Sequence, residues 1–226
     1  DICLLMPTRS VLRGVEEALS KIGIPFRVES QSLVLESQDV SELLACLRAI
    51  DSPSDQVSVV AALRSSAFGC SDVDLLRYVD MGGRFDYVES DIADGPVKRA
   101  MEIIAEFHGL RVWVSPEQLI ESFLRRTRMI ESSFLFPGFR ERLRRYRLVM
   151  DNAASFASVS DSSLRSFLDW IENQIKRGAM TTEAPIPEPD EDSVRIMTVH
   201  ASKGLEFPIV ILAGLGANER TNIGPV

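Results

Sequence analysis

The sequence predicts an α/β protein in which a parallel sheet is interrupted by an all-helical insertion. Short apolar runs alternate with amphipathic helical patterns at the start of the chain, and two more short apolar runs lie near its end. Between them the residues carry helical periodicity without a convincing strand. Strands that alternate with helices are typical of parallel sheets covered by helices, whereas an unbroken series of helices packs as a layer of its own.

The chain opens with a strand pattern followed by one helix. Residues 2–6 are a continuous apolar run ended by Pro7, as in a strand that is covered on both faces of a parallel sheet. From Ser10 the apolar positions recur at helical spacing up to Ile22, and Gly23 supplies the left-handed residue that commonly ends a helix. These residues predict a strand, a turn and an amphipathic helix.

A second strand and a second helix follow. Residues 24–28 alternate in polarity like a strand, and residues 40–50 show helical periodicity behind Ser37 or Asp39 as the N-cap. The order strand, helix, strand, helix predicts the first part of an α/β domain.

Helical periodicity then dominates the middle of the chain. The predicted helices cover residues 57–63, 73–79, 97–107, 116–128, 139–157 and 164–176. Residues 185–192 are rich in proline and acidic side chains, which predicts an exposed linker rather than a helix. The strand pattern resumes at residues 194–199 and again at 208–213, which we expect to be another buried strand.

These patterns predict two parts. Residues 1–65 and 185–226 are expected to form one α/β domain, and residues 66–184 a helical subdomain inserted into it. Both ends of the chain fall within the α/β pattern, so we expect them to be boundaries within a larger protein.

Composition limits the class of protein. The chain is 45% hydrophobic and 26% charged, as in globular proteins. Its net charge of -8 opposes general attraction to polyanions, so any nucleic-acid contact must be local. Cys3, Cys46 and Cys70 lie far apart, which indicates neither a zinc site nor a disulfide framework and favours the reducing cytoplasm. No apolar run reaches the roughly 18 residues of a membrane span, so no membrane contact is expected.

The loop between the last two predicted strands concentrates polar chemistry. Groups suited to phosphate and sugar contacts crowd into it: Thr198, His200, Ser202, Lys203, Gly204 and Glu206. The hydroxyls and the imidazole can bond phosphate oxygens, Gly204 allows a close backbone approach, and Glu206 can accept from a sugar hydroxyl. In open α/β sheets, ligands bind outside the carboxyl ends of the strands. A solvated loop that binds nothing is the alternative.

Met197 through Phe207 resembles motif V of the superfamily 1A helicases, the group of UvrD, Rep, PcrA and the RecB and AddA motor subunits. The usual form of that motif is close to M-T-hydrophobic-H-x-x-K-G-L-E-F. The resemblance implies a RecA-like sheet domain of the P-loop NTPase type, here the second motor domain in part. It also implies that Thr198 and His200, with Ser202 and Lys203, contact DNA, and that Glu206, with Gly204, contacts ATP.

The start of the chain is similar to the motif IV region of the same family. Arg13 precedes Glu16-Glu17-Ala18-Leu19 at the matching distance. A guanidinium suits a phosphate because it donates two parallel hydrogen bonds and stays charged. The resemblance therefore implies that Arg13 is the catalytic contact to the γ-phosphate of ATP, with Arg9 as the alternative.

Phe68-Gly69-Cys70-Ser71 is similar to the glycine-centred turn of the family, which implies a DNA phosphate contact at Gly69. The alternative is that Ser71 is simply an N-cap. Trp113 and Trp170 are expected in the helical core rather than stacked on bases. Two arginine clusters either contact duplex DNA or form a solvated or salt-bridged surface: Arg125, Arg126, Arg128, Arg140, Arg142, Arg144, Arg145 and Arg147.

The resemblance implies a parent protein that is an ATP-dependent DNA helicase. It would couple ATP hydrolysis to translocation on single-stranded DNA and to duplex unwinding in repair or recombination. ATP and Mg²⁺ would be bound mainly by an N-terminal motor domain, because these 226 residues contain no G-x-x-x-x-G-K-[ST] loop. The residues alone are therefore not expected to be active.

Two other functions stay open. One is a non-enzymatic helicase-like module that binds a protein partner in a nuclease or repair complex. The other is a regulatory role in which the helical part inhibits the motor. The expected partners are single-stranded and duplex DNA, the N-terminal motor domain and a repair or nuclease protein.

Overall fold

The computed structural model describes residues 2–7, 11–29, 34–88, 94–135, 138–157, 163–177 and 193–215. The chain divides into two compact units. The first, here the sheet unit, comprises Asp1–Val34 and Thr182–Val226, and the second, the helical unit, comprises Leu35–Thr181. The predicted linker at 185–192 lies outside the described residues.

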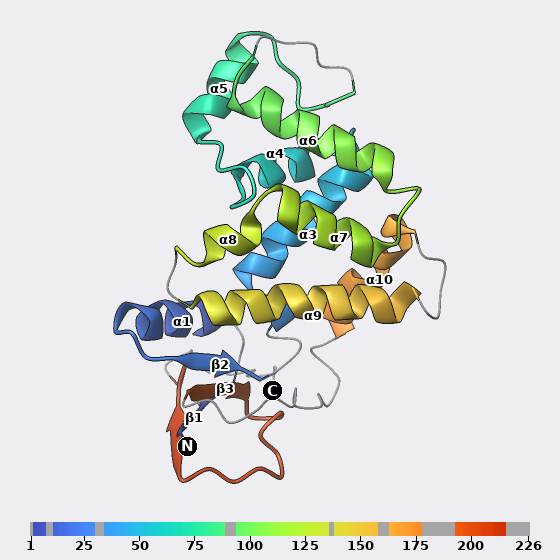
Figure 1. Ribbon diagram of the computed structural model, residues 1–226. Helices are drawn as coiled ribbons and strands as arrows, with labels where there is room; N and C mark the ends of the chain where they lie inside the picture. Colours follow the sequence, from blue (N-terminus) through green and yellow to red (C-terminus); the bar gives the residue numbers. More distant parts are fainter. Residues whose placement is uncertain are drawn as a thin grey trace, which may run out of the picture. The chain divides into compact units, whose positions relative to one another are not determined.

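The sheet unit is a parallel sheet with strands from both ends of the chain. Its elements are β1 (Ile2–Met6), α1 (Leu12–Lys21), β2 (Phe26–Val28), β3 (Val194–Thr198) and β4 (Ile209–Leu212). The 4-stranded sheet has the order β2-β3-β1-β4, and all three strand pairs are parallel (Figure 1). The predicted α/β class is confirmed, as is the prediction that the first and last strands share one sheet.

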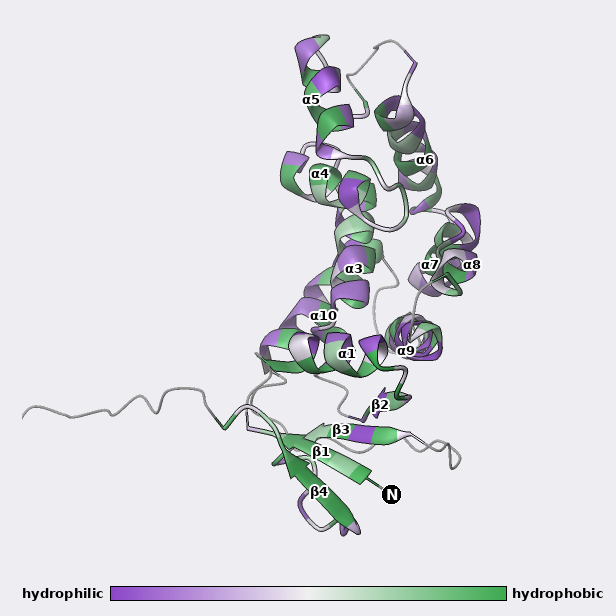
Figure 2. Cartoon of the chain, turned by 90° about the vertical axis from the view of Figure 1, so that its left-hand side faces the viewer, coloured by the Kyte–Doolittle hydropathy of each residue, from purple (hydrophilic) through white to green (hydrophobic). Residues whose placement is uncertain are grey.

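Burial separates the middle of the sheet from one of its edges. Cys3 and Met6 of β1 and Ile196 of β3 are fully buried, as expected for central strands. All four residues of β4 are exposed, although they are apolar (Figure 2). The prediction of a buried strand there was wrong, because within the described part of the chain β4 is an edge strand that pairs with β1 alone.

The helical unit packs its helices around α3. Its elements are α3 (Gln38–Asp51), α4 (Gln56–Arg64), α5 (Asp72–Asp80), α6 (Pro96–Leu110), α7 (Pro116–Arg126), α8 (Met129–Ser133), α9 (Phe139–Ala157) and α10 (Leu164–Arg177). α3 contacts α4, α6, α9 and α10. Its residues Leu43, Leu47 and Ile50 are completely buried in the common core. No strand occurs among the described residues of this unit.

Three features differ from the sequence expectations. The compact units divide between Val34 and Leu35, so that α3 and α4 pack with the helices rather than with the α/β part ending at residue 65. The predicted helix over 116–128 ends at Arg126, because Arg128 adopts a left-handed φ of 56° before the short α8. Trp113 was expected in the core but is 82% exposed. Trp170, by contrast, packs against the core as predicted.

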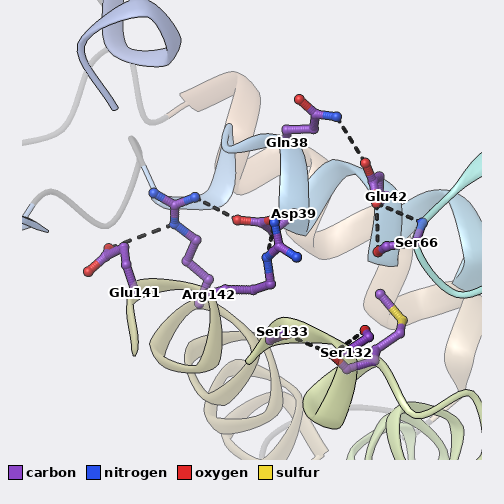
Figure 3. A network of polar contacts seen from close by, with 10 residues as sticks. Gln38, Asp39, Glu42, Ser66, Ser132, Ser133, Glu141 and Arg142 are labelled. Carbon is purple, nitrogen blue, oxygen red and sulfur yellow. Dashed lines mark hydrogen bonds and ion pairs between the residues drawn. The ribbon is translucent and has the colours of Figure 1, made fainter. Parts of the chain in front are cut away.

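A buried ionic cluster joins the start of α3 to α9. The carboxylate of Asp39 accepts from Arg142 Nε at 2.8 Å (Figure 3). It also accepts from Arg145 Nη1 at 2.7 Å. Ser37 is the N-cap residue of α3, but its side chain makes no capping bond. Asp39, the alternative cap predicted from the sequence, instead neutralises two arginines that follow it by more than a hundred residues.

Candidate nucleotide and nucleic-acid site

The carboxyl ends of three strands meet at one edge of the sheet. Met6 and Thr198, the last residues of β1 and β3, lie opposite each other in register. Just beyond them, the N–H of Val199 donates to the carbonyl of Met6 at 3.2 Å, and that of Ala213 donates to Leu5 at 2.8 Å. This is the edge at which open α/β sheets bind ligands.

The loop that follows β3 is held by its own hydrogen bonds. Thr198 Oγ1 accepts from the N–H of Ala201 at 3.2 Å, and Ser202 Oγ donates to the carbonyl of Val199 at 2.9 Å. Gly204 has a φ of +86°, a conformation that side chains rarely adopt. The polar residues of the loop thus build a defined turn, not an unstructured connection.

These bonds determine which hydroxyl can still donate. Thr198 Oγ1 is used as an acceptor, so its hydrogen is available for a phosphate oxygen. The hydrogen of Ser202 Oγ is engaged by Val199, which leaves that oxygen only acceptor capacity. In this conformation Thr198 is suited to a phosphate, and Ser202 is suited to closing the turn.

Three charged or ionisable side chains of the loop face solvent. His200, Lys203 and Glu206 are all exposed. An ammonium and an imidazole can contact a phosphate backbone, and a carboxylate can accept from sugar hydroxyls. The loop therefore presents both phosphate-binding and sugar-binding groups at the carboxyl edge of the sheet.

Arg13 lies in the first turn of α1, which begins beyond the carboxyl end of β1. Its side chain is 74% exposed, and its Nε pairs with the carboxylate of Glu17 at 3.0 Å. A Cβ placed on Gly214, just after β4, would lie 3.0 Å from Val11, so the start of α1 adjoins the end of β4. Arg13 is thus at the same edge as the loop. Arg9, the alternative phosphate contact, lies outside the described residues.

A buried ionic group under the loop was not found from the sequence. Arg27 and Arg195 are paired in register on β2 and β3, and both contact the carboxylate of Glu29. Arg195 also lies over the ring of Phe207, at 5.7 Å from its centroid. Burial, reinforced by the charge of Glu29, raises the pKa of the neighbouring Cys3 thiol to about 11. Arg27 in β2 and Glu29 just after it were the available signal in the sequence, but only the strand register brings Arg195 to them.

Gly69 belongs to the helical unit, whereas the other predicted site residues belong to the sheet unit. It has a φ of +61°, as expected for a glycine-centred turn. Its N–H donates to the carbonyl of Ser65 at 2.8 Å. Ser71 forms a capping box with Asp74 at the start of α5. The N–H groups of Gly69 and Ser71 are therefore used within the chain, and acidic Asp74 occupies the first turn.

The arginine clusters are largely engaged within the helical unit. Arg142 and Arg145 face inward to Asp39, and Arg125 pairs with Glu121 at 2.7 Å on the surface of α7. Arg128 and Arg147 are exposed. Such pairing agrees with the salt-bridged alternative for Arg125, Arg142 and Arg145, although Arg142 and Arg145 are largely buried rather than on the surface.

The donor set suits part of an ATP molecule. Glu206 offers an exposed carboxylate to a ribose, and Arg13 offers an exposed guanidinium to a phosphate. Among the described residues, no three His, Cys, Asp or Glu side chains gather as metal ligands. In the same part of the chain, no helix is both long and apolar enough to cross a membrane.

The loop and the helices before it match a known family. The model of the UvrD-like helicase C-terminal domain matches residues 126–221. The chain is also similar to proteins that are named as the A subunits of ATP-dependent helicase/nucleases. It is 30% identical to that of Bacillus cytotoxicus, over 98% of this chain and 19% of the relative.

Other relatives of the same name give the same result. The protein of Oceanobacillus iheyensis is 32% identical over 95% of this chain and 18% of its own length, and that of Geobacillus kaustophilus gives the same three values. The chain thus spans about a fifth of the length of the curated relatives it matches. The resemblance of the chain to the superfamily 1A helicases is thereby confirmed, and the match to the UvrD-like helicase C-terminal domain covers residues 126–221.

Proposed function

We propose that the chain is the second motor region of an ATP-dependent DNA helicase that translocates on single-stranded DNA and unwinds duplexes in repair or recombination. The observation that carries this proposal is the loop from Thr198 to Phe207. It has the residues of the helicase motif, and it projects its charged side chains at the carboxyl edge of a parallel sheet. The names of the relatives support a helicase assignment.

In the proposed mechanism one edge of the sheet unit contacts both ligands. Thr198 donates its remaining hydroxyl hydrogen to a DNA phosphate, and Lys203 and His200 add contacts to the same backbone. Glu206 accepts from the ribose of ATP. Thr198 and Glu206 belong to one hydrogen-bonded loop, so a movement of the ATP contact at Glu206 displaces the DNA contact at Thr198. The affinity for DNA is thereby coupled to the state of the bound nucleotide.

Arg13 would act on the terminal phosphate. ATP supplies the phosphoryl group that passes to water, and negative charge on the transferred oxygens is stabilised by a guanidinium. In the structure Arg13 is paired with Glu17 on the same helix face. We propose that Arg13 exchanges this exposed partner for the γ-phosphate when an N-terminal motor domain presents the nucleotide.

The N-terminal motor domain would supply the phosphate loop and the ligands of Mg²⁺. The 226 residues contain no such loop, so we expect them to hydrolyse no ATP by themselves. Turnover by the purified chain that disappears in Glu206→Ala would contradict this expectation.

The test is DNA-stimulated ATP hydrolysis by the full-length protein. Arg13→Ala should lower kcat by roughly 10³-fold, the scale of a phosphate-stabilising arginine. Glu206→Ala should mainly raise KM for ATP. Glu17→Ala is the matched control, since it removes the partner of Arg13 and leaves the guanidinium in place.

The outcomes separate the open alternatives. A normal kcat in Arg13→Ala with a large loss in Arg9→Ala would transfer the catalytic role to Arg9. A non-enzymatic module would be favoured by a different result. The full-length protein would then show no ATPase activity, and Arg13→Ala, Glu206→Ala and Glu17→Ala would all bind a nuclease or repair protein with unchanged affinity. Faster unwinding after deletion of residues 66–184 would indicate that the helical part inhibits the motor.

A further inference from the structure

An open pocket of about 550 Å³ lies within the helical unit, where three segments converge. These are the end of α3 at Asp51, the connection of α6 to α7 over residues 111–115, and the start of α10 over residues 163–165. The volume falls within the range of small-molecule sites, which runs from roughly 300 to 1,000 Å³. The pocket is therefore large enough to hold one nucleotide unit of a longer strand.

Trp113 lines the pocket and is 82% exposed. Its neighbour Val112 lines it as well and is also exposed. The N–H of Trp113 donates to the carbonyl of Leu110 at 2.9 Å, which fixes the backbone of the connection. A large aromatic ring held on an anchored turn and left in solvent is suited to stacking on a flat ligand.

The polar lining favours an anion over a cation. Arg111 and Arg165 contribute two guanidinium groups, against the single carboxylate of Asp51. Arg165 pairs with Asp51 at 2.9 Å, and Arg111 donates to the carbonyl of His108. Each guanidinium carries five N–H donors, so one such bond does not exhaust either side chain. The lining is locally basic within a chain of net charge -8.

Two helices also begin at the pocket. Ser115 caps α7, and Ser163 accepts from the N–H of Ser166 in the first turn of α10. The first turn of α10 contains no acidic residue, whereas that of α7 contains Glu117. The positive end of the α10 dipole therefore adds to the charge of Arg165, while Glu117 opposes an anion at α7.

We infer that this pocket binds single-stranded DNA, with a base stacked on Trp113 and the adjoining phosphate held by Arg165 and Arg111. One ligand then explains both the exposed ring and the basic lining, since each nucleotide carries an aromatic face and an anionic group. A protein partner could also contact the tryptophan and the two arginines. An apolar segment of such a partner, however, would offer no hydrogen-bond acceptor to the guanidinium groups of Arg111 and Arg165. The inference rests on the proposed DNA-binding function only for the choice of ligand.

The test uses the intrinsic fluorescence of the whole chain. The sequence contains two tryptophans, so Trp170→Phe leaves Trp113 as the only reporter. Titration with a thymidine oligonucleotide of about 12 nucleotides, within the range of single-strand sites, should quench that emission. The same oligonucleotide with a fluorescent label should bind roughly 5- to 150-fold more weakly to Trp113→Ala, the range for loss of one stacked base.

The arginine contribution has a matched control. Arg165→Ala should weaken binding and reduce the slope of log affinity against log salt by about 0.7, as expected for one lost phosphate contact on a single strand. Arg99→Ala should change neither, although Arg99 is 61% exposed, against 68% for Arg165, and also pairs with an aspartate, Asp94. Trp113 and Arg165 are both exposed, so their replacement should leave the fold intact.

Two outcomes would overturn the inference. One is unchanged Trp113 emission at oligonucleotide concentrations that saturate the labelled-DNA assay. The other is affinity for Trp113→Ala within twofold of the unmodified chain. If Lys203→Ala abolished DNA binding while Trp113→Ala did not change it, DNA binding in the pocket would be contradicted. The proposed function of the loop would then still be supported. Binding lost in Trp113→Ala and kept in Lys203→Ala would support the pocket and count against the proposed role of the loop.

Discussion

Thr198 lies opposite Met6 at the ends of two parallel strands, and the N–H of the next residue, Val199, donates to the Met6 carbonyl. This pairing makes the start of the loop a continuation of the sheet. The loop is then closed by two side-chain hydroxyls, each with a different hydrogen-bonding role. Because the roles differ, the two hydroxyls should respond differently to removal.

Thr198→Val should weaken binding of a thymidine oligonucleotide about tenfold. The substitution keeps the shape of the side chain but removes the hydrogen that is available to a phosphate, together with the acceptor of the Ala201 N–H. A hydrogen bond to a charged group contributes about 1.5 kcal/mol. Fluorescence anisotropy of labelled DNA measures the affinity. Ser202→Ala is the control, because the hydrogen of Ser202 is already engaged by Val199. Equal losses of affinity in both variants would contradict the assigned roles.

Asp39→Ala should destabilise the helical unit by about 3 kcal/mol, as measured by urea unfolding. Asp39 is 13% exposed and Arg145 only 6%, so removal of the carboxylate leaves buried positive charge without this partner. Glu121→Ala removes an exposed partner of Arg125 and should cost less than about 1 kcal/mol. A similar loss in both variants would show that the Asp39 cluster is no more important than a surface pair.

The N-cap of α4 should give stability that depends on pH. Asp55 accepts from the hydroxyl and the N–H of Ser58, and these bonds hold its pKa below the ordinary 3.8. A carboxyl with a lowered folded pKa stabilises the protein above its unfolded pKa, and that contribution is lost as pH falls through the folded pKa.

Asp55→Ala should therefore cost about 1 kcal/mol at pH 7. Its difference from the unmodified chain should shrink as pH falls below 3.8. Thermal unfolding between pH 2.5 and 7 would measure this. Asp55→Asn keeps a capping oxygen without the titrating group, so it should remain near the unmodified stability at pH 7. A loss in Asp55→Ala that is constant across this range would contradict the capping role.

The cysteines should react slowly with a thiol reagent in the folded chain. Burial raises the pKa of Cys46 to about 12, and it also raises the pKa of Cys70 above its ordinary value. The thiolate is the reactive form, so little of it is present at pH 8. Dithionitrobenzoate should label all three thiols only after addition of guanidinium. Rapid labelling of the folded chain would show that the buried assignment is wrong.

Much of the fold could be predicted because each element is encoded locally. The helix α1 ends before Gly23, which has the positive φ predicted for it. The strand β3 follows the alternation of residues 194–199, and the parallel order of the sheet follows from strands that alternate with helices. Periodicity alone could not show that α3 packs with the helices, because an amphipathic helix does not specify what covers its apolar face.

The site was predicted less completely than the fold. A compact motif gathers Thr198, His200, Lys203 and Glu206 in one loop, and a loop keeps its residues together in any fold. The contacts of Glu29 with Arg27 and Arg195 depend on strand register, which the sequence does not state. Trp113 was misjudged because an aromatic residue between two helices is ordinarily buried.

DNA contact by the loop after β3 can be measured by an amide NMR titration of the isotopically labelled chain with a thymidine oligonucleotide. If the loop after β3 contacts DNA, the resonances of residues 198–204 should shift and broaden as DNA is added. Those of the buried strand β1 should change little, since its backbone groups are held within the sheet. Saturable DNA binding that leaves the resonances of residues 198–204 unperturbed would contradict a DNA contact at this loop.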